Sequence, residues 1–284
     1  MTTLGDLAEL VRAPAALSVP GDVVAGAAAA GALGPRTPAL AGASVLLYWA
    51  GMAANDWADR RLDAEERPER PIPSGRVTPA AAVGLAAGLT AAGVGLAAVV
   101  GGRRAAALAV PLAATIWGYD LLAKNTAAGP AVMAACRGLD VLLGASGGRV
   151  TRALPAAATV AAHTWTVTAL SRREVTGADA TLPKWTLAGT AVVAASAAVV
   201  APRRMAALPA VLAGWYAARY GAAQAEVVRD PSAGRVRAAV GAGITGLPAL
   251  QGALTARGGA GLLGLAVAAA APLGRRLARK VSPT

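Results

Sequence analysis

The chain alternates between long apolar stretches, rich in alanine, valine, leucine and glycine, and short polar gaps. Each stretch is close to the roughly 20 residues that an α-helix needs to cross the hydrocarbon core of a bilayer. The stretches are 15–34, 38–55, 79–101, 105–122, 129–147, 153–171, 184–201, 205–221, 237–254 and 259–274. This pattern predicts an all-α polytopic membrane helical bundle. We expect a single domain over residues 1–284, because no shift in composition marks a second one.

The number of membrane spans is predicted as nine or ten. The stretch 236–254 contains four glycines and Pro248, which favours a bent or partly inserted helix. The basic C-terminal segment 274–284 favours a cytoplasmic C-terminus and therefore ten spans.

The composition agrees with a membrane protein. Hydrophobic residues make up 56% of the chain and charged residues only 15%, whereas soluble domains carry about a quarter charged residues. A water-soluble, alanine-rich helical bundle is the weaker alternative. The N-terminal segment carries Asp6 and Glu9 before any apolar run, so it does not resemble a cleaved signal peptide.

The net charge of +12 does not indicate a nucleic-acid partner, because the basic residues lie in the gaps between apolar stretches and not along one face. Cytoplasmic loops of membrane proteins carry the excess of lysine and arginine. The side that carries residues 53–79 has about twice as many basic residues as the other side. We therefore expect this side and the N-terminus to face the cytoplasm, in the cell (inner) membrane.

Six of the fifteen acidic residues lie between Ala53 and Pro79. Asn55, Asp59 and Asp63 are four residues apart and therefore share one face of a helix. Their charges repel unless something neutralises them, and Mg²⁺ prefers such oxygen ligands together with phosphate groups. The neighbouring arginines are suited to bind phosphate oxygens. They are Arg60, Arg61, Arg67, Arg70 and Arg76. A solvated charge run is the alternative, although it does not require acids in a four-residue register.

The segments "NDWADRRLD" and "RPERPIPSGRVTP" resemble the N-D-x-x-D-x-x-x-D motif of the UbiA superfamily of intramembrane prenyltransferases and the arginine-proline-glycine sequence that follows it. Within that superfamily the chain is most similar to the EboC-like branch. The resemblance implies a UbiA-like fold and Mg²⁺-dependent transfer of a prenyl group from a polyprenyl diphosphate to an unidentified acceptor. It places the catalytic loops at about 55–78, 119–130 and 171–184, on the cytoplasmic side.

By this resemblance one Mg²⁺ is held by a group of four residues, of which Asp59 and Asp63 also count as catalytic. The four are Asn55, Asp56, Asp59 and Asp63. Arg70 is expected to bind the diphosphate. Tyr119 and Lys124 resemble the superfamily's tyrosine and lysine, and the lysine contacts the diphosphate. The alternative for both is ordinary anchoring at the membrane interface.

Arg137 and Asp140 lie three residues apart within a predicted span. Ionisable residues inside a membrane cost roughly 2.5–3.5 kcal/mol each and usually have a function. We expect Arg137 to bind the diphosphate as a catalytic residue, and a structural Arg137–Asp140 pair is the alternative. Asp120, one helical turn before Lys124, is expected to pair with it.

The third loop departs from the superfamily's second aspartate-rich motif. Glu174 and Asp179 are its remaining candidate metal ligands, but they are five residues apart instead of four. One Mg²⁺, or a second one held weakly, fits this sequence. Arg172 is expected to contact the diphosphate.

His163, the only histidine, precedes Glu174 by eleven residues, which places both on nearly one face of a helix. It is a candidate for the acceptor pocket, as is Asp22, and a hydrogen-bonded packing role is the alternative for His163.

Two other functions remain open at this point: an intramembrane terpene cyclase and a non-enzymatic membrane transporter.

Overall fold

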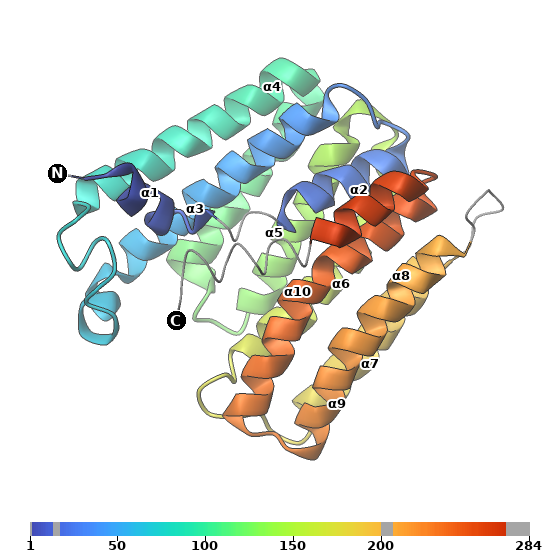
Figure 1. The fold of residues 1–284 in the computed structure, drawn as a ribbon. Coiled ribbons are helices and arrows are strands. Elements are labelled where there is room, and N and C mark those ends of the chain that lie inside the picture. Colours follow the sequence, from blue (N-terminus) through green and yellow to red (C-terminus); the bar gives the residue numbers. More distant parts are fainter. Residues whose placement is uncertain (1, 14–17, 200–206, 271–284) are drawn as a thin grey trace.

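The computed structural model describes residues 2–13, 18–199 and 207–270 (Figure 1). These residues form helices joined by turns and short loops, with no β-strand among them. The helices are α1 Leu4–Leu10, α2 Pro20–Ala30, α3 Thr37–Glu66, α4 Pro79–Gly118, the π-helix η2 Tyr119–Ala123, α5 Gly129–Gly144, the 3₁₀ turn η3 Ala145–Gly147, α6 Val150–Ser171, α7 Leu182–Ala197, α8 Leu208–Tyr216, the π-helix η4 Ala217–Gly221, α9 Ala222–Arg229 and α10 Ala233–Arg257. A further apolar helix covers Gly261–Ala270.

These helices correspond to the predicted stretches. Helix α4 contains two of them, because Gly102 interrupts it with φ 66° and ψ −160°, a conformation that glycine adopts without steric cost. Helices α8, η4 and α9 follow one another directly. The first two lie within the predicted stretch 205–221, and α9 continues the helix beyond it. With α4 counted as two, the described part of the chain contains ten helices that match the ten stretches.

Two of these elements are long and apolar enough by themselves to cross a membrane, Thr37–Glu66 and Pro79–Ala123. Helix α10 is continuous through its glycines and Pro248, and a bend or partial insertion of 236–254 stays a prediction. The basic segment 274–284 and the loop arginines Arg203 and Arg204 lie outside the described residues.

Helices α2 and α5 contact one another through their backbones. A Cβ atom added to Gly26 would lie 1.8 Å from the carbonyl oxygen of Val141, and one added to Gly144 would lie 2.0 Å from that of Val23. Small residues of this kind allow membrane helices to pack closely. Helix α2 packs also against α10, and α3 packs along α4 (Figure 1).

The bundle has two poles. The motif pole comprises residues 55–78, 119–130 and 171–184, which are the three predicted catalytic loops. The arginine pole, at the other end of α3, comprises residues 31–37, 101–104 and 144–152. The backbone N–H of Arg149 donates to Ala30 across the arginine pole, at 3.2 Å, and at the motif pole Lys124 contacts Asp59 at 2.6 Å.

Candidate active site

Helix α3 extends beyond the predicted membrane boundary and carries the acidic motif on its last turns. It ends at Glu66, because Pro68 disfavours helical geometry in the residue before it, and Arg67 has φ −146°. The chain then turns back through residues 67–78 to the start of α4. The motif is therefore a helix end, and only its arginine-rich continuation is a loop.

Each aspartate of the motif binds a basic side chain from a different segment. Asp56 contacts Arg12 at 2.7 Å, Asp59 contacts Lys124 at 2.6 Å and Asp63 contacts Arg70 at 2.8 Å. We call these contacts the three motif pairs. Arg70 also lies 3.4 Å from Asp56. Three positive charges thus face three negative ones, and the repulsion expected from the sequence is neutralised by the protein itself.

The motif pairs differ in exposure. The side chains of Asp56 and Asp63 are only 5% and 4% exposed. Asp59 is 25% exposed and its partner Lys124 is 14% exposed. The Asp59–Lys124 pair is therefore the one whose carboxylate is most open to a ligand.

The π-helix η2 sets the position of Lys124. The backbone N–H of Lys124 donates to Tyr119, five residues back, at 2.9 Å. This extra residue in the turn directs Lys124 to Asp59 instead of Asp120, so the expected Asp120–Lys124 pair is not formed. Asp120 accepts a hydrogen bond from the amide of Asn55 at 3.2 Å. Tyr119 is half-buried at the same pole.

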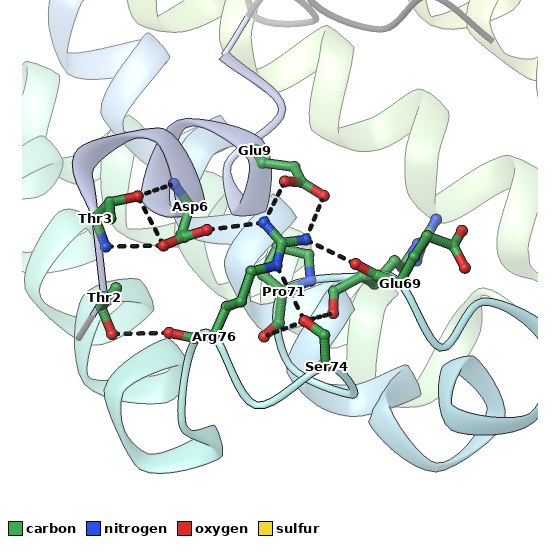
Figure 2. A network of polar contacts seen from close by, with 9 residues as sticks. Thr2, Thr3, Asp6, Glu9, Glu69, Pro71, Ser74 and Arg76 are labelled. Atoms are coloured by element: carbon green, nitrogen blue, oxygen red, sulfur yellow. Dashed lines mark hydrogen bonds and ion pairs between the residues drawn. The ribbon is translucent and has the colours of Figure 1, made fainter.

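The loop 67–78 is held by the N-terminal helix α1 (Figure 2). The guanidinium of Arg76 donates to Asp6 at 2.8 Å and to Glu9 at 2.7 and 3.0 Å, and it reaches the carbonyl oxygen of Glu69 at 2.7 Å. Thr3 and Asp6 form a capping box at the start of α1. Hydrogen bonds from Thr3, followed by the one from Arg76, lower the pKa of Asp6 to about 2. Arg76 therefore fastens α1 to the loop.

The third loop contacts the second loop through Arg172. Its guanidinium donates to the carbonyl oxygen of Thr126 and lies 3.5 Å from that of Lys124. Glu174 is half-buried, burial raises its pKa, and its carbonyl oxygen accepts from Arg237 at 2.7 Å. Because α6 ends at Ser171, Glu174 lies in the following turn. The predicted helical face shared with His163 is therefore wrong.

Asp179 caps the start of α7. Its carboxylate accepts from the hydroxyl of Thr181 at 2.6 Å and from the backbone N–H groups of Thr181 and Leu182 at 2.8 Å each. These bonds lower the pKa of Asp179 to about 2. The adjacent Ala178 donates to Pro231 at 2.9 Å, so this part of the loop packs against the α9–α10 connection. The structure does not bring Glu174 or Asp179 into polar contact with the motif on α3.

Among the described residues, no three histidine, cysteine, aspartate or glutamate side chains lie together as a metal site. The aspartates of α3 instead contact their basic partners, as described above. Asn55, Asp56, Asp59 and Asp63 still provide one amide and three carboxylate groups within nine residues of a single helix. These are the hard oxygen ligands that Mg²⁺ takes.

Arg137 lies in a buried network within the bundle. It contacts Asp22 of α2 at 2.7 Å and stands over the ring of Tyr48 at 5.4 Å. Gln251 of α10 donates to Asp22 at 2.6 Å, and Asp140 accepts from the hydroxyl of Ser44. The alternative Arg137–Asp140 pair is therefore not formed, because Asp22 takes that place, and the role of Arg137 in diphosphate binding stays a prediction. Asp22 is fully buried and is bonded to both Arg137 and Gln251, and its place in an acceptor pocket stays a prediction.

His163 is also buried by hydrogen-bonded side chains. Its Nδ1 lies 2.8 Å from the hydroxyl of Tyr216, and the ring of Tyr220 packs against it edge-on. Thr166 contacts the Tyr220 hydroxyl at 3.2 Å. The structure supports the packing role for His163. Sequence reasoning gave no role to Arg12 or to the acids of α1, and the only signal for them was the Thr-x-x-Asp spacing of the capping box.

The UbiA prenyltransferase family matches residues 18–224, which include α3 and all three loops. The chain belongs to this family. Digeranylgeranylglyceryl phosphate synthases are similar to it. The synthase of Methanopyrus kandleri is 43% identical over 76 residues, which cover 27% of this chain and 28% of the relative. The synthase of Natronomonas pharaonis is 35% identical over 146 residues, which cover 51% of this chain and 53% of the relative. The matched part spans at most about half the length of these UbiA-family relatives.

Two solved structures share the fold. A digeranylgeranylglyceryl phosphate synthase studied in membranes superposes with a TM-score of 0.69 at 15% identity, over 90% of this chain and 98% of that one. The apo UbiA homolog from Aeropyrum pernix K1 superposes with a TM-score of 0.65 at 21% identity, over 88% and 96%. The predicted UbiA-like membrane bundle is confirmed. The assignment to the EboC-like branch stays a prediction.

Proposed function

We propose that this UbiA-family protein transfers a prenyl group from a polyprenyl diphosphate to an acceptor within the membrane. The observation that carries the proposal is the Asp59–Lys124 pair at 2.6 Å, which joins the acidic motif to the second loop. A carboxylate for a metal and a cation for a phosphate lie side by side there. The proposal includes a cytoplasmic location for the motif pole and the N-terminus, because the acidic residues and most basic ones lie on that side.

The basic residues of the motif pairs are the diphosphate-binding groups in this proposal. When the allylic C–O bond breaks, its electron pair leaves with the diphosphate, and the acceptor forms the new bond to the allylic carbon while its proton passes to solvent. Lys124 and Arg70 would exchange their carboxylate partners for phosphate oxygens and stabilise the leaving charge. Arg172 and Tyr119 border the same loops and would complete this side of the site.

The carboxylates released in that exchange would hold magnesium. Asn55, Asp56, Asp59 and Asp63 fit this ion by the chemistry of their donor atoms, and when bound it supplies charge neutralisation at the diphosphate. Glu174 is the remaining third-loop candidate for a second ion. Asp179 is occupied as the cap of α7. The residues of the chain therefore favour a single strong magnesium site on α3.

The acceptor is proposed from the relatives' names. A synthase of digeranylgeranylglyceryl phosphate makes a glyceryl phosphate that carries two geranylgeranyl groups. We therefore place a prenylated glyceryl phosphate first among the acceptors to test. The alternative function is an intramembrane terpene cyclase, in which the ionised prenyl chain closes on itself and no acceptor is needed. A non-enzymatic transporter is less well supported, since the motif pairs provide both groups that diphosphate ionisation requires.

The test is turnover by the full-length protein in detergent. The protein is incubated with Mg²⁺ and farnesyl, geranylgeranyl or longer diphosphates, with and without the glyceryl phosphate acceptor, and diphosphate and lipid products are measured. Acceptor-dependent diphosphate release supports prenyl transfer, and release with a cyclic product in the absence of acceptor supports the cyclase. Binding of the prenyl diphosphate with no release under any condition would refute both.

The orientation has its own test. Single cysteines at Ser74, Asn125 and Thr181, in a Cys136→Ser background, place one label in each loop of the motif pole. All three positions should react only with a reagent that reaches the cytoplasmic side. Labelling of any one of them exclusively from outside would contradict the proposed topology.

A further inference from the structure

We propose that the arginine pole contains a binding site for the phosphate group of an anionic phospholipid. A cavity of about 280 Å³ opens there, at the end of the bundle opposite the acidic motif. It is lined by Ala32, Gly34, Pro35, Arg36, Leu40, Gly101, Gly144, Ser146 and Gly147. These residues come from the α2–α3 connection, from the kink of α4 and from the end of α5 with η3.

A residue that lines this cavity has a buried hydroxyl without a partner. Ser146 is only 2% exposed, and its Oγ has no hydrogen-bond partner among the described residues. A Cβ added to Gly101, which also lines the cavity, would lie 3.5 Å from this Oγ. The hydroxyl thus lies in the cavity wall, beside Gly101. Leaving a buried hydroxyl unbonded is costly, and a bound phosphate oxygen would satisfy it.

The charges at this pole select an anion. Arg36 lines the cavity and is exposed, and no carboxylate contacts it among the described residues. Four more exposed arginines belong to the same pole but do not line the cavity. They are Arg103, Arg104, Arg149 and Arg152. None of the fifteen acidic residues lies within 31–37, 101–104 or 144–152. The uncompensated guanidinium of Arg36 favours phosphate, which it binds through paired N–H donors.

The position of the cavity favours a lipid over a free anion. It lies where α2 and α5 end and α3 begins, which is the level of the lipid headgroups in a bilayer that the bundle spans. Its wall combines Arg36 and Ser146 with the apolar side chains of Leu40, Ala32 and Pro35. Such a wall suits a phosphate attached to a glycerol and an acyl chain.

The test uses thermal unfolding of the full-length protein in a neutral detergent. Phosphatidylglycerol should raise the unfolding temperature in a saturable way and more than phosphatidylcholine does. Arg36→Gln and Ser146→Ala should each weaken phosphatidylglycerol binding, Arg36→Gln by about tenfold or more because it removes a charge-assisted contact. Arg152→Gln, which removes an exposed arginine of the same pole outside the cavity, should leave the affinity unchanged.

Three results would overturn the proposal. The first is an equal loss of affinity in Arg152→Gln and Arg36→Gln, which would indicate general charge attraction. The second is full stabilisation by inorganic phosphate alone, which would indicate a free-anion site. The third is retention of full affinity in both cavity variants. The readout does not depend on turnover, so it stands apart from the prenyltransferase test.

Discussion

The motif pairs and the buried network around Arg137 both join carboxylates to basic groups at about the same distance, but they differ in charge balance and exposure. At the motif pole three carboxylates face three cations, and Asp59 is 25% exposed. In the network Arg137 binds Asp22, which is 0% exposed, while Asp140 contacts Ser44. Each motif pair has a basic side chain that is 14–39% exposed and can exchange its carboxylate partner for a phosphate. Arg137 and Asp22 are 8% and 0% exposed, and their separation costs more because it leaves an uncompensated charge in the interior.

Loss of the guanidinium in Arg137→Ala should have the largest effect on stability. It leaves Asp22 buried without its cation, and breaking a buried pair in this way costs roughly 3–5 kcal/mol. Unfolding in detergent measures the loss. The double variant Asp22→Asn with Arg137→Ala should recover part of it. A single variant as stable as the parent would remove the distinction between the two regions.

Removal of the amine in Lys124→Ala should act on turnover and not on stability. Loss of one charge-assisted contact to the diphosphate corresponds to roughly 1.5–3 kcal/mol, about a tenfold to hundredfold fall in kcat/KM. Lys184→Ala is the matched control, since Lys184 is exposed on α7. If kcat/KM of the Lys124 variant stays within about twofold of the control, Lys124 is only an interfacial anchor.

Asp59→Asn and Asp63→Asn should separate catalysis from stability. Both should abolish turnover. Asp63 is 4% exposed and holds Arg70 at 2.8 Å, so its variant should lose roughly 1–3 kcal/mol of stability even without ligands. Because Asp59 is more exposed, its variant should lose little stability. Thermal unfolding of the metal-free proteins compares them, and equal stability of the two variants would contradict the ranking by burial.

The carboxylate of Asp6, which accepts hydrogen bonds from Thr3 and Arg76, should give the smallest effect and a defined pH dependence. These bonds lower the pKa of Asp6 to about 2, below the ordinary value near 4. The stabilisation is therefore complete above about pH 4 and is lost as the pH falls toward 2. Asp6→Asn should melt slightly below the parent at pH 7, and this difference should shrink between pH 4 and pH 2. A difference that stays constant over this range would exclude the ionised contact as its source.

The sequence was sufficient for the fold because the apolar stretches and their lengths are local properties. The helical register of Asn55, Asp59 and Asp63 was predictable for the same reason. The ion-pair partners of these residues could not be predicted from the sequence. Nothing local indicates that Arg12 reaches Asp56 across 44 residues, or that Asp22 from α2 displaces Asp140 from Arg137. These pairings depend on how distant helices pack against one another. The spacing of residues along one helix gives no information about that packing.

The π-helix η2 also affects how the relatives are aligned. A π-turn is an α-turn that contains one more residue. The N–H of Lys124 therefore donates to the carbonyl oxygen of Tyr119, five positions back, where a regular α-helix would use the residue four positions back. A relative with a regular α-helix here would need a one-residue gap. If the gap is omitted, the lysine is matched to a residue about 100° away around the helix axis. Evolutionary comparisons of the second loop should therefore be anchored on the structure and not on residue count.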